Sequence, residues 1–379
     1  MTTGVVVLNF GEPAEPTREN VVTYLERIFF DNAELDGDTT EREARERARK
    51  LAERRAPGLI EEYEAMGGGS PLNPQARDQA DRLETELRDR SYDVRTYVGM
   101  QFTEPLIADA VGQAHEDGVD HLVGLPIYPL CGATTTVASL ETMRGAAADL
   151  DWDVETDELT GWHKHPLYNR LRADNVRAYA AEHDLDLGDP ETELFFSAHG
   201  TPTHYLDEGS RYDTYVSEWC SVMSRMLGVS EYTLGFQNHG NRDIAWTQPD
   251  IETAIENVDA ERVVVEPVSF MHEQSETLSE LDVELREEAE AEGLEFHRVP
   301  VPHDDDRFRT VLADLVEPFV GEFDPRYYQF RQCQCKDTPG TMCLNAPTDV
   351  PVRRRRRRRG HRALAGPPPH RARGSGRRP

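Results

Sequence analysis

The chain has 379 residues, enough for two domains of ordinary size, and 37% of them are hydrophobic, so it can fill real cores. Twelve of its arginines lie in residues 353–379, and the first 352 residues carry 30 basic against 71 acidic side chains, a formal −41. This charge argues against nucleic acid as a partner of the body. An acid-rich surface with only three lysines is typical of proteins from a very salty cytoplasm.

The start of the chain, MTTGVVVLNFGEP, has no basic end and only a short apolar run, so we expect no signal peptide. No apolar stretch approaches the length of a membrane span. Five cysteines in such a chain predict free thiols or a metal site rather than a disulfide framework. We therefore expect a cytoplasmic protein.

Short apolar runs and helical patterns alternate along the first part of the chain. Strands are predicted near residues 5–8, 94–98, 121–126 and 153–159. Helices are predicted near residues 19–30, 41–66, 73–88, 107–116, 139–148 and 167–182. Such alternation predicts a parallel sheet with right-handed crossovers.

The second part repeats the alternation. Strands are predicted near residues 193–197, 232–237, 263–265 and 295–299, and helices near 212–226, 250–256, 306–319 and from about 274 onward. The expected fold class is α/β, with two Rossmann-like domains whose parallel four-stranded sheets are flanked by helices and face each other across a cleft.

We expect an N-terminal domain over residues 1–160 and a C-terminal domain over 161–325. A cysteine-bearing extension follows over 326–352, and then a tail of mostly Arg, Gly and Pro over 353–379. The tail cannot bury enough apolar surface to order itself. We favour an appended or out-of-frame tail over a basic arm that binds nucleic acid or an acidic partner.

The stretch VVVEPVSFMHEQSETLSELDVE, residues 263–284, carries the first functional signal. After the strand, Glu276, Glu280 and Glu284 recur four apart on a predicted helix, so their carboxylates form one row, here called the acidic line. A solvated helix face would show the same spacing. The position favours a site, because open α/β sheets bind ligands at the carboxyl ends of their strands.

The stretch FFSAHGTP places His199 at the carboxyl end of another buried strand. A neutral histidine can accept a proton or coordinate a metal. A lone histidine is more often a hydrogen-bonded structural residue. The acidic line at the equivalent edge of the same predicted sheet favours the functional alternative.

These two stretches closely resemble the ferrochelatases, which insert Fe(II) into a porphyrin. VVVLNFGEP, ERRAPGLIEEYEAMGGGSPLN, LPIYPLCGATTTVASL and WTQP follow the order and spacing of that family, so the resemblance covers about residues 4–320. It implies a porphyrin cleft between the two domains. Each motif is weak alone, but together they are highly specific.

The resemblance implies two catalytic residues. His199 matches the histidine that takes pyrrole protons or holds iron, and Glu276 matches its acidic partner. Glu280 and Glu284 continue the line along which the metal approaches, so the implied metal-binding residues are His199, Glu276, Glu280 and Glu284. A base is needed because porphyrin loses two N–H protons, and oxygen or imidazole ligands are needed because Fe(II) arrives hydrated.

The resemblance also implies a porphyrin-binding set. Arg54, Arg55 and Ser70 are candidates for the propionates, since a guanidinium matches a carboxylate bidentately. Surface salt bridges are an equal alternative for the two arginines. Phe10 and Trp246 are candidates for packing on the flat ring.

Three positions depart from the family pattern. Gln274 stands where many relatives have a second histidine, and Gln101 replaces a common arginine. Phe10 stands where some coproporphyrin-using relatives have a tyrosine, which excludes ligation of the product by a phenolate at this position.

Cys333, Cys335 and Cys343 are spaced C-x-C-x7-C and resemble the segment that binds a [2Fe–2S] cluster in some ferrochelatases. Cys131 is the candidate fourth ligand, about two residues before the usual place. Four thiolates suit zinc equally well, and free cysteines are a further alternative. Cys220, beside a tryptophan on a helix, is expected to be a core thiol.

The function implied is a ferrochelatase, a lyase that forms nitrogen–metal bonds in haem biosynthesis, acting on coproporphyrin III or protoporphyrin IX. The partners are the porphyrin and Fe(II). No organic cofactor and no membrane span are expected, and the sequence leaves open whether the chain forms a homodimer. One rival is a chelatase for cobalt or nickel, which affinity alone does not exclude. The other is a porphyrin or haem carrier, which would not need the histidine, its acidic partner and the outer carboxylates together.

Overall fold

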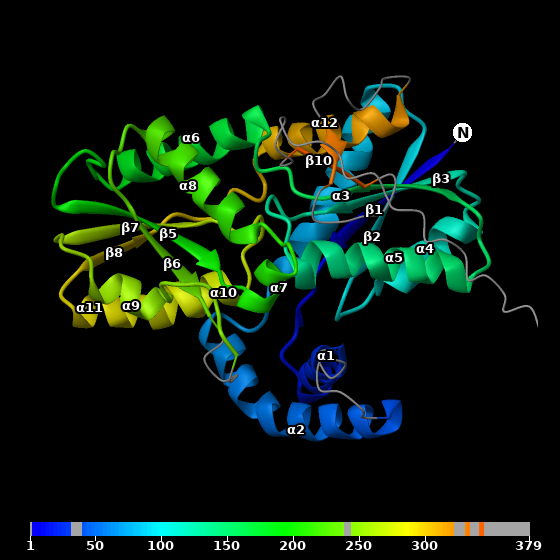
Figure 1. Cartoon of the computed structure of the whole chain (residues 1–379), viewed down its shortest axis with the longest axis horizontal. Helices are drawn as coiled ribbons and strands as arrows, with labels where there is room; N and C mark the ends of the chain where they lie inside the picture. The colour runs from blue at the N-terminus through cyan, green and yellow to red at the C-terminus, as the bar shows by residue number, and fades with distance from the viewer. Residues whose placement is uncertain (1, 32–39, 239–243, 322–329, 334–340, 345–379) are drawn as a thin grey trace, which may run out of the picture.

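The computed structural model describes residues 2–31, 40–238, 244–321, 330–333 and 341–344. Cys335 and the tail over residues 353–379 lie outside the described residues. The chain builds two sheets that lie side by side with helices on both faces of each (Figure 1). The α/β fold class predicted from the sequence is therefore confirmed.

The first sheet has the strand order β2-β1-β3-β4-β10-β9. Its strands are β1 (Thr3–Asn9), β2 (Val94–Met100), β3 (His121–Pro126), β4 (Glu155–Leu159), β9 (Arg331–Gln332) and β10 (Thr341–Cys343). The first four are parallel, as predicted, and β10 extends them in parallel beside β4. Only the short β9, paired with β10, is antiparallel among the described strands of this sheet.

The second sheet has the order β6-β5-β7-β8 and is parallel throughout. Its strands are β5 (Thr192–His199), β6 (Thr233–Gln237), β7 (Arg262–Pro267) and β8 (Glu295–Arg298). The central strands form because each is a short apolar run buried on both sides, as Val263, Val264 and Val265 are in β7.

Helices cover both faces of each sheet (Figure 1). Helices α3 (Leu72–Asp89) and α12 (Asp306–Val320) lie on one face of the first sheet, and α4 (Ile107–Glu116) and α5 (Ala138–Asp149) on the other. The second sheet lies between α6 (Pro166–Glu182) and α8 (Tyr212–Leu227) on one side and α9 (Ile251–Glu256) and α11 (Arg286–Ala291) on the other. A short α7 (Thr203–Asp207) follows β5.

Helices α1 (Arg18–Asp31) and α2 (Glu41–Ala65) pack on each other outside the sheets (Figure 1). Small side chains four residues apart, Ala44, Ala48, Ala52 and Ala56, form the buried face of α2. The helix ends at Ala65, close to the limit predicted near residue 66.

One hydrophobic core runs through both sheets, because α12 packs on α3 as well as on α6. The last helix that the structure describes thus returns to the first sheet. The predicted domain limits near residue 160 stay a prediction. Among the described helices, none has the length and apolar composition needed to cross a membrane.

The acidic line lies on a helix that changes type. The α-helix α10 (Ser275–Leu278) leads into the π-helix η3 (Glu280–Leu285), which continues as α11. A bond of 3.0 Å from the Glu284 amide to the Ser279 carbonyl, five residues back, is typical of a π-helix. The regular α-helix predicted here is therefore wrong for this turn. A second π-helix, η2 (Ala133–Val137), follows β3 in the first sheet.

Candidate active site

A cavity opens at the carboxyl ends of the strands, between the two sheets. It holds about 1140 Å³ of space without protein atoms, counting the solvent at its mouth. Its walls include Phe10, Tyr128, Leu130 and Thr134 from the side of the first sheet, and His199, Tyr212, Trp246, Ser269, Gln274 and Glu276 from the side of the second. Ligand crevices of open α/β sheets lie at this edge.

His199 ends β5 and has a defined tautomer. Its Nδ1 lies 2.6 Å from the carbonyl oxygen of Gly200, which can only accept, so Nδ1 carries the proton of the neutral ring. The lone pair is then on Nε2. Burial lowers the pKa of His199, and the bond to Gly200 only partly offsets this. A neutral imidazole of this tautomer can act as a base or as a metal ligand through Nε2.

The loop after β7 fixes the end of β5. The backbone amide of His199 donates to Ser269 Oγ at 2.9 Å, and Tyr212 Oη donates to the His199 carbonyl at 3.0 Å. The hydroxyls of Tyr212 and Ser269 lie 2.8 Å apart. The ring of Phe270 meets the imidazole edge-on, with 6.3 Å between centroids. These contacts fix the position of the His199 ring at the cavity.

Glu276 lies in α10 and lines the same cavity. Its Oε2 accepts from Gln274 Nε2 at 2.8 Å and lies 3.1 Å from Ser275 Oγ. Burial raises the pKa of Glu276. Gln274, at the place of a second histidine in many relatives, is thus a hydrogen-bond donor to the candidate catalytic acid.

Glu12 is the site residue that sequence reasoning missed. It follows β1, is 2% exposed, and accepts hydrogen bonds from the amide of Ser275, at 3.1 Å, and from its hydroxyl. Burial, together with the Glu276 carboxylate, raises the pKa of Glu12 to about 7. The signal was present, because Glu12 follows a glycine just beyond a buried strand, where ligand crevices form.

The acidic line leads from the cavity to the surface. Glu276 lines the cavity, Glu280 is bound by Gln237 Nε2 at 2.8 Å, and Glu284 is exposed. Burial, and next the Glu276 carboxylate, raise the pKa of Glu280 to about 8. The Glu284 carboxylate is close enough to α2 to add to the effect of burial in raising the pKa of Glu62. That a metal follows this line stays a prediction.

Comparison with known proteins gives the family. The ferrochelatase family matches residues 2–319. A ferrochelatase of Nostoc punctiforme is 32% identical over 326 residues, 83% of this chain and 81% of the relative. A ferrochelatase of Synechococcus sp. (strain JA-3-3Ab) is 34% identical over 325 residues, 84% of this chain and 93% of the relative.

The chain belongs to the ferrochelatase family. The resemblance found in the sequence is therefore confirmed. A solved structure described as SirB from Bacillus subtilis with Fe3+ is 11% identical, with a TM-score of 0.47, over 86% of this chain and 99% of that chain. A likeness at this level says nothing about the ferrochelatase site.

Two ring-packing candidates of a ferrochelatase, Phe10 and Trp246, line the cavity. The Phe10 ring packs edge-on against Phe102 at 4.6 Å between centroids. Gln101, at the place of a common family arginine, donates from Nε2 to the carbonyl of Thr134 at 3.1 Å. It supports the cavity wall rather than facing the cavity.

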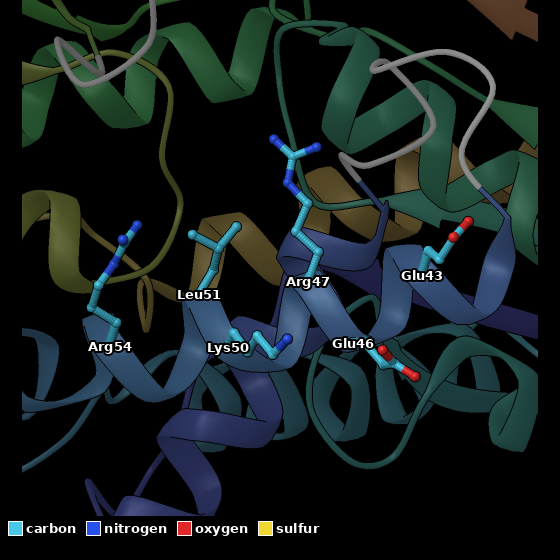
Figure 2. A pocket seen from close by; sticks show the side chains of 6 residues that line it. All are labelled: Glu43, Glu46, Arg47, Lys50, Leu51 and Arg54. Carbon is cyan, nitrogen blue, oxygen red and sulfur yellow. The ribbon is translucent and has the colours of Figure 1, made fainter.

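The propionate candidates of a ferrochelatase lie elsewhere. Ser70 is 3% exposed, and its hydroxyl binds Glu12 and lowers the pKa of that carboxyl in part. Arg54 lies with Arg47 and Leu51 on one side of α2, along a shallow groove made by α2 alone (Figure 2). Arg55 is exposed on α2, and its charge partly offsets the rise in the pKa of Glu62. Neither arginine lines the cavity, and their porphyrin role stays a prediction.

Two of the four candidate cluster cysteines, Cys333 and Cys343, pack together. Cys131, Cys333 and Cys343 are all buried, and beyond the effect of burial Cys333 and then Cys131 raise the pKa of the Cys343 thiol. β10 brings Cys343 there by pairing with β4. Cys220 is a fully buried core thiol on α8, as predicted. In the part of the chain that the structure describes, no three His, Cys, Asp or Glu side chains form a group that could hold a metal ion.

Proposed function

We propose that this chain binds a porphyrin in the cavity between its sheets and inserts Fe(II) into it. One observation carries the proposal: a histidine with its lone pair on Nε2, at the end of β5, and the half-buried carboxyl group of Glu276, in α10, line the same cavity. Phe10 and Trp246 in its wall supply aromatic surface for a flat macrocycle. In this proposal the substrate is coproporphyrin III or protoporphyrin IX.

The residues would share the chemistry as follows. His199 accepts a pyrrole proton at Nε2, because burial keeps its imidazole neutral near pH 7. Glu276 faces the same cavity as an oxygen ligand or proton acceptor. Glu280 and Glu284 supply further carboxylates, so hydrated Fe(II) can exchange water for protein oxygen stepwise. Binding energy from the periphery of the ring distorts the macrocycle and makes the nitrogen lone pairs accessible to the metal.

Two rival functions make different predictions. A carrier needs the cavity but has no use for a neutral histidine, an acid that lines the cavity and further acids leading to the surface. A cobalt or nickel chelatase would use the same groups with another metal or a more reduced tetrapyrrole. The arrangement of His199 and the acidic line therefore favours catalysis, and the family favours Fe(II).

An anaerobic insertion assay separates these functions. Fe(II), Co(II) and Ni(II) are each offered with coproporphyrin III, protoporphyrin IX and a reduced tetrapyrrole, and insertion is followed by absorbance. We expect turnover with Fe(II) and at least one of the two porphyrins. Binding of porphyrin without insertion of any metal would support the carrier, and turnover only with the reduced tetrapyrrole would support the other chelatase.

We propose also that the cysteines bind a metal group. The proposal is supported by Cys333 and Cys343, which pack together, and by the buried Cys131, whose charge acts on the Cys343 thiol; Cys335 would be the remaining ligand. Thiolates would hold a [2Fe–2S] cluster or zinc. Protein made under iron-replete, low-oxygen conditions should be brown-red and bleach on dithionite, and Cys343→Ser should remove the colour. Colourless protein with neither acid-labile sulfide nor zinc would refute the site.

A cytoplasmic location, a salt-rich habitat and a homodimer stay predictions. The habitat is supported by the formal charge of −41 on the first 352 residues, which salt would screen.

A further inference from the structure

The backbone of Glu12 is fixed by contacts with α3 and with the segment after β2. Gly11 has φ +81°, and a Cβ there would lie 2.4 Å from Thr103 Oγ1, so this turn requires glycine. The Glu12 amide donates to Asn73 Oδ1 at 3.0 Å, and Asn73 Nδ2 donates to Thr103 at 2.9 Å. The Glu12 side chain therefore leaves the turn after β1 from a fixed backbone.

The Glu12 carboxylate crosses to the loop of the second sheet. It accepts from both the amide and the hydroxyl of Ser275, the first residue of α10. Two glutamines on α3 bind the same loop further back, since Gln75 Oε1 accepts from the Glu273 amide at 2.9 Å and Gln79 Nε2 donates to the Met271 carbonyl at 3.1 Å. Only Glu12 reaches α10 itself among these three.

Ser275 links Glu12 to Glu276. The hydroxyl that binds Glu12 also lies 3.1 Å from Glu276 Oε2. A displacement of Ser275 would move the backbone of Glu276 and the hydroxyl beside its carboxyl group together. The distance between that carboxyl group and His199 would therefore depend on Glu12, which follows β1 on the opposite side of the cavity.

We propose that Glu12 is a positioning residue, which holds Ser275 from the first sheet and thereby sets Glu276 against His199 across the cavity. This inference rests on the proposed function. It makes the two sides of the cavity interdependent, because the acid that acts on one face of the ring is placed by the side that carries Phe10. Small displacements at a reacting centre lower the rate by large factors. We therefore expect the loss of this positioning to lower kcat.

The test compares Glu12→Ala with Glu12→Gln. We expect Glu12→Ala to lower kcat about tenfold while the KM for porphyrin changes less than about twofold. Glu12→Gln should recover most of the loss, because its amide oxygen still accepts from the Ser275 amide. Gln75→Ala, which removes a hydrogen bond from the same loop but not from α10, should leave kcat within about twofold.

A double-mutant cycle separates positioning from general stability. In single-turnover reactions of the Glu276→Gln protein, adding Glu12→Ala should cause no further loss, because Glu12 acts through Glu276. Additive losses would overturn the proposal, and so would an equal loss of kcat in Gln75→Ala. If Glu12→Ala does not fold, Ser275→Ala removes the hydroxyl bond to Glu12 and keeps the amide bond, so a smaller loss of kcat is expected, again with no further loss in the Glu276→Gln protein.

Hydrogen exchange tests the link without any substrate. Amides of residues 271–276 should exchange faster in Glu12→Ala than in the unchanged chain and in Glu15→Ala, a control at an exposed position of the same loop. Equal exchange would overturn the positioning role even if the chain proves to insert no metal. Faster exchange in a chain that inserts no metal would refute the proposed function alone.

Discussion

The side-chain amide of Gln237 lies 2.8 Å from the carboxylate of Glu280. The same Nε2 lies 2.9 Å from the carbonyl oxygen of Glu276, and Ser197 Oγ donates to Gln237 Oε1 at 3.0 Å. Strands β5 and β6 thus hold the backbone of the first acid and the side chain of the second. The acidic line is positioned by the end of the sheet as well as by its own helix.

Glu284→Gln should mainly raise the KM for Fe(II), by about two- to fivefold, and leave kcat and porphyrin affinity unchanged. Glu284 is exposed at the outer end of the acidic line, so it can act on the metal before the metal reaches the ring. Initial rates over a range of Fe(II) concentrations measure this. Glu287→Gln, an exposed acid nearby on α11, is the control, and weaker porphyrin binding in Glu284→Gln would contradict a metal path.

Glu12→Gln should change how stability depends on pH. Unfolded Glu12 titrates near 4.5 and folded Glu12 near 7, so between these values the folded chain holds a proton that the unfolded chain has lost. The contribution of this bound proton to the free energy of unfolding is complete below pH 4.5 and is lost as pH rises to about 7. From pH 5 to 8 the variant should gain on the order of 2 kcal/mol of unfolding free energy relative to the unchanged chain.

Denaturant titrations at fixed salt between pH 5 and 8 measure this difference. Parallel stability curves for the two proteins would mean that the Glu12 carboxyl group does not keep its proton on folding. Glu15→Gln, at an exposed position, should give a curve parallel to that of the unchanged chain.

Arg172→Ala should destabilise the fold by about 3–5 kcal/mol. Arg172 and Glu266 are both fully buried, with Arg172 Nε 2.8 Å from Glu266 Oε1, and Arg172 Nη1 donates to the Phe270 carbonyl at 3.1 Å. The variant would leave Glu266 as an unpaired buried charge under the loop of the active site. Arg170→Ala, exposed on the same helix, should cost less than about 1 kcal/mol, and equal losses would contradict a buried pair.

Much of the fold could be predicted because buried strands and amphipathic helices have simple local patterns. The strand over residues 121–126 and the helix over 107–116 have the predicted limits. The short strands β9 and β10 have no such pattern. They exist because β10 pairs with the outer edge of β4, a contact between distant parts of the chain.

The cavity residues could be predicted where they lie at the end of a strand or in a motif of the family, as Phe10 and Trp246 do. His199 was found that way, but the hydrogen bond between Glu12 and Ser275 joins residues 263 positions apart and has no local signal. Spacing alone likewise could not show the π-helix, because tertiary contacts select it. A matching motif likewise does not fix on which side of α2 a side chain lies: Arg54 borders a groove on α2 and does not line the cavity, and its porphyrin role stays a prediction.

The most direct test of the account is metal insertion by His199→Ala and Glu276→Gln under anaerobic conditions, with porphyrin affinity measured by fluorescence. Both residues are assigned to proton and metal exchange rather than to holding the ring. Each variant should lose at least about a hundredfold in turnover and keep porphyrin affinity within about threefold. His183→Ala, at the end of α6, is the control for histidine loss. Turnover near that of the unchanged chain in either active-site variant would contradict the account.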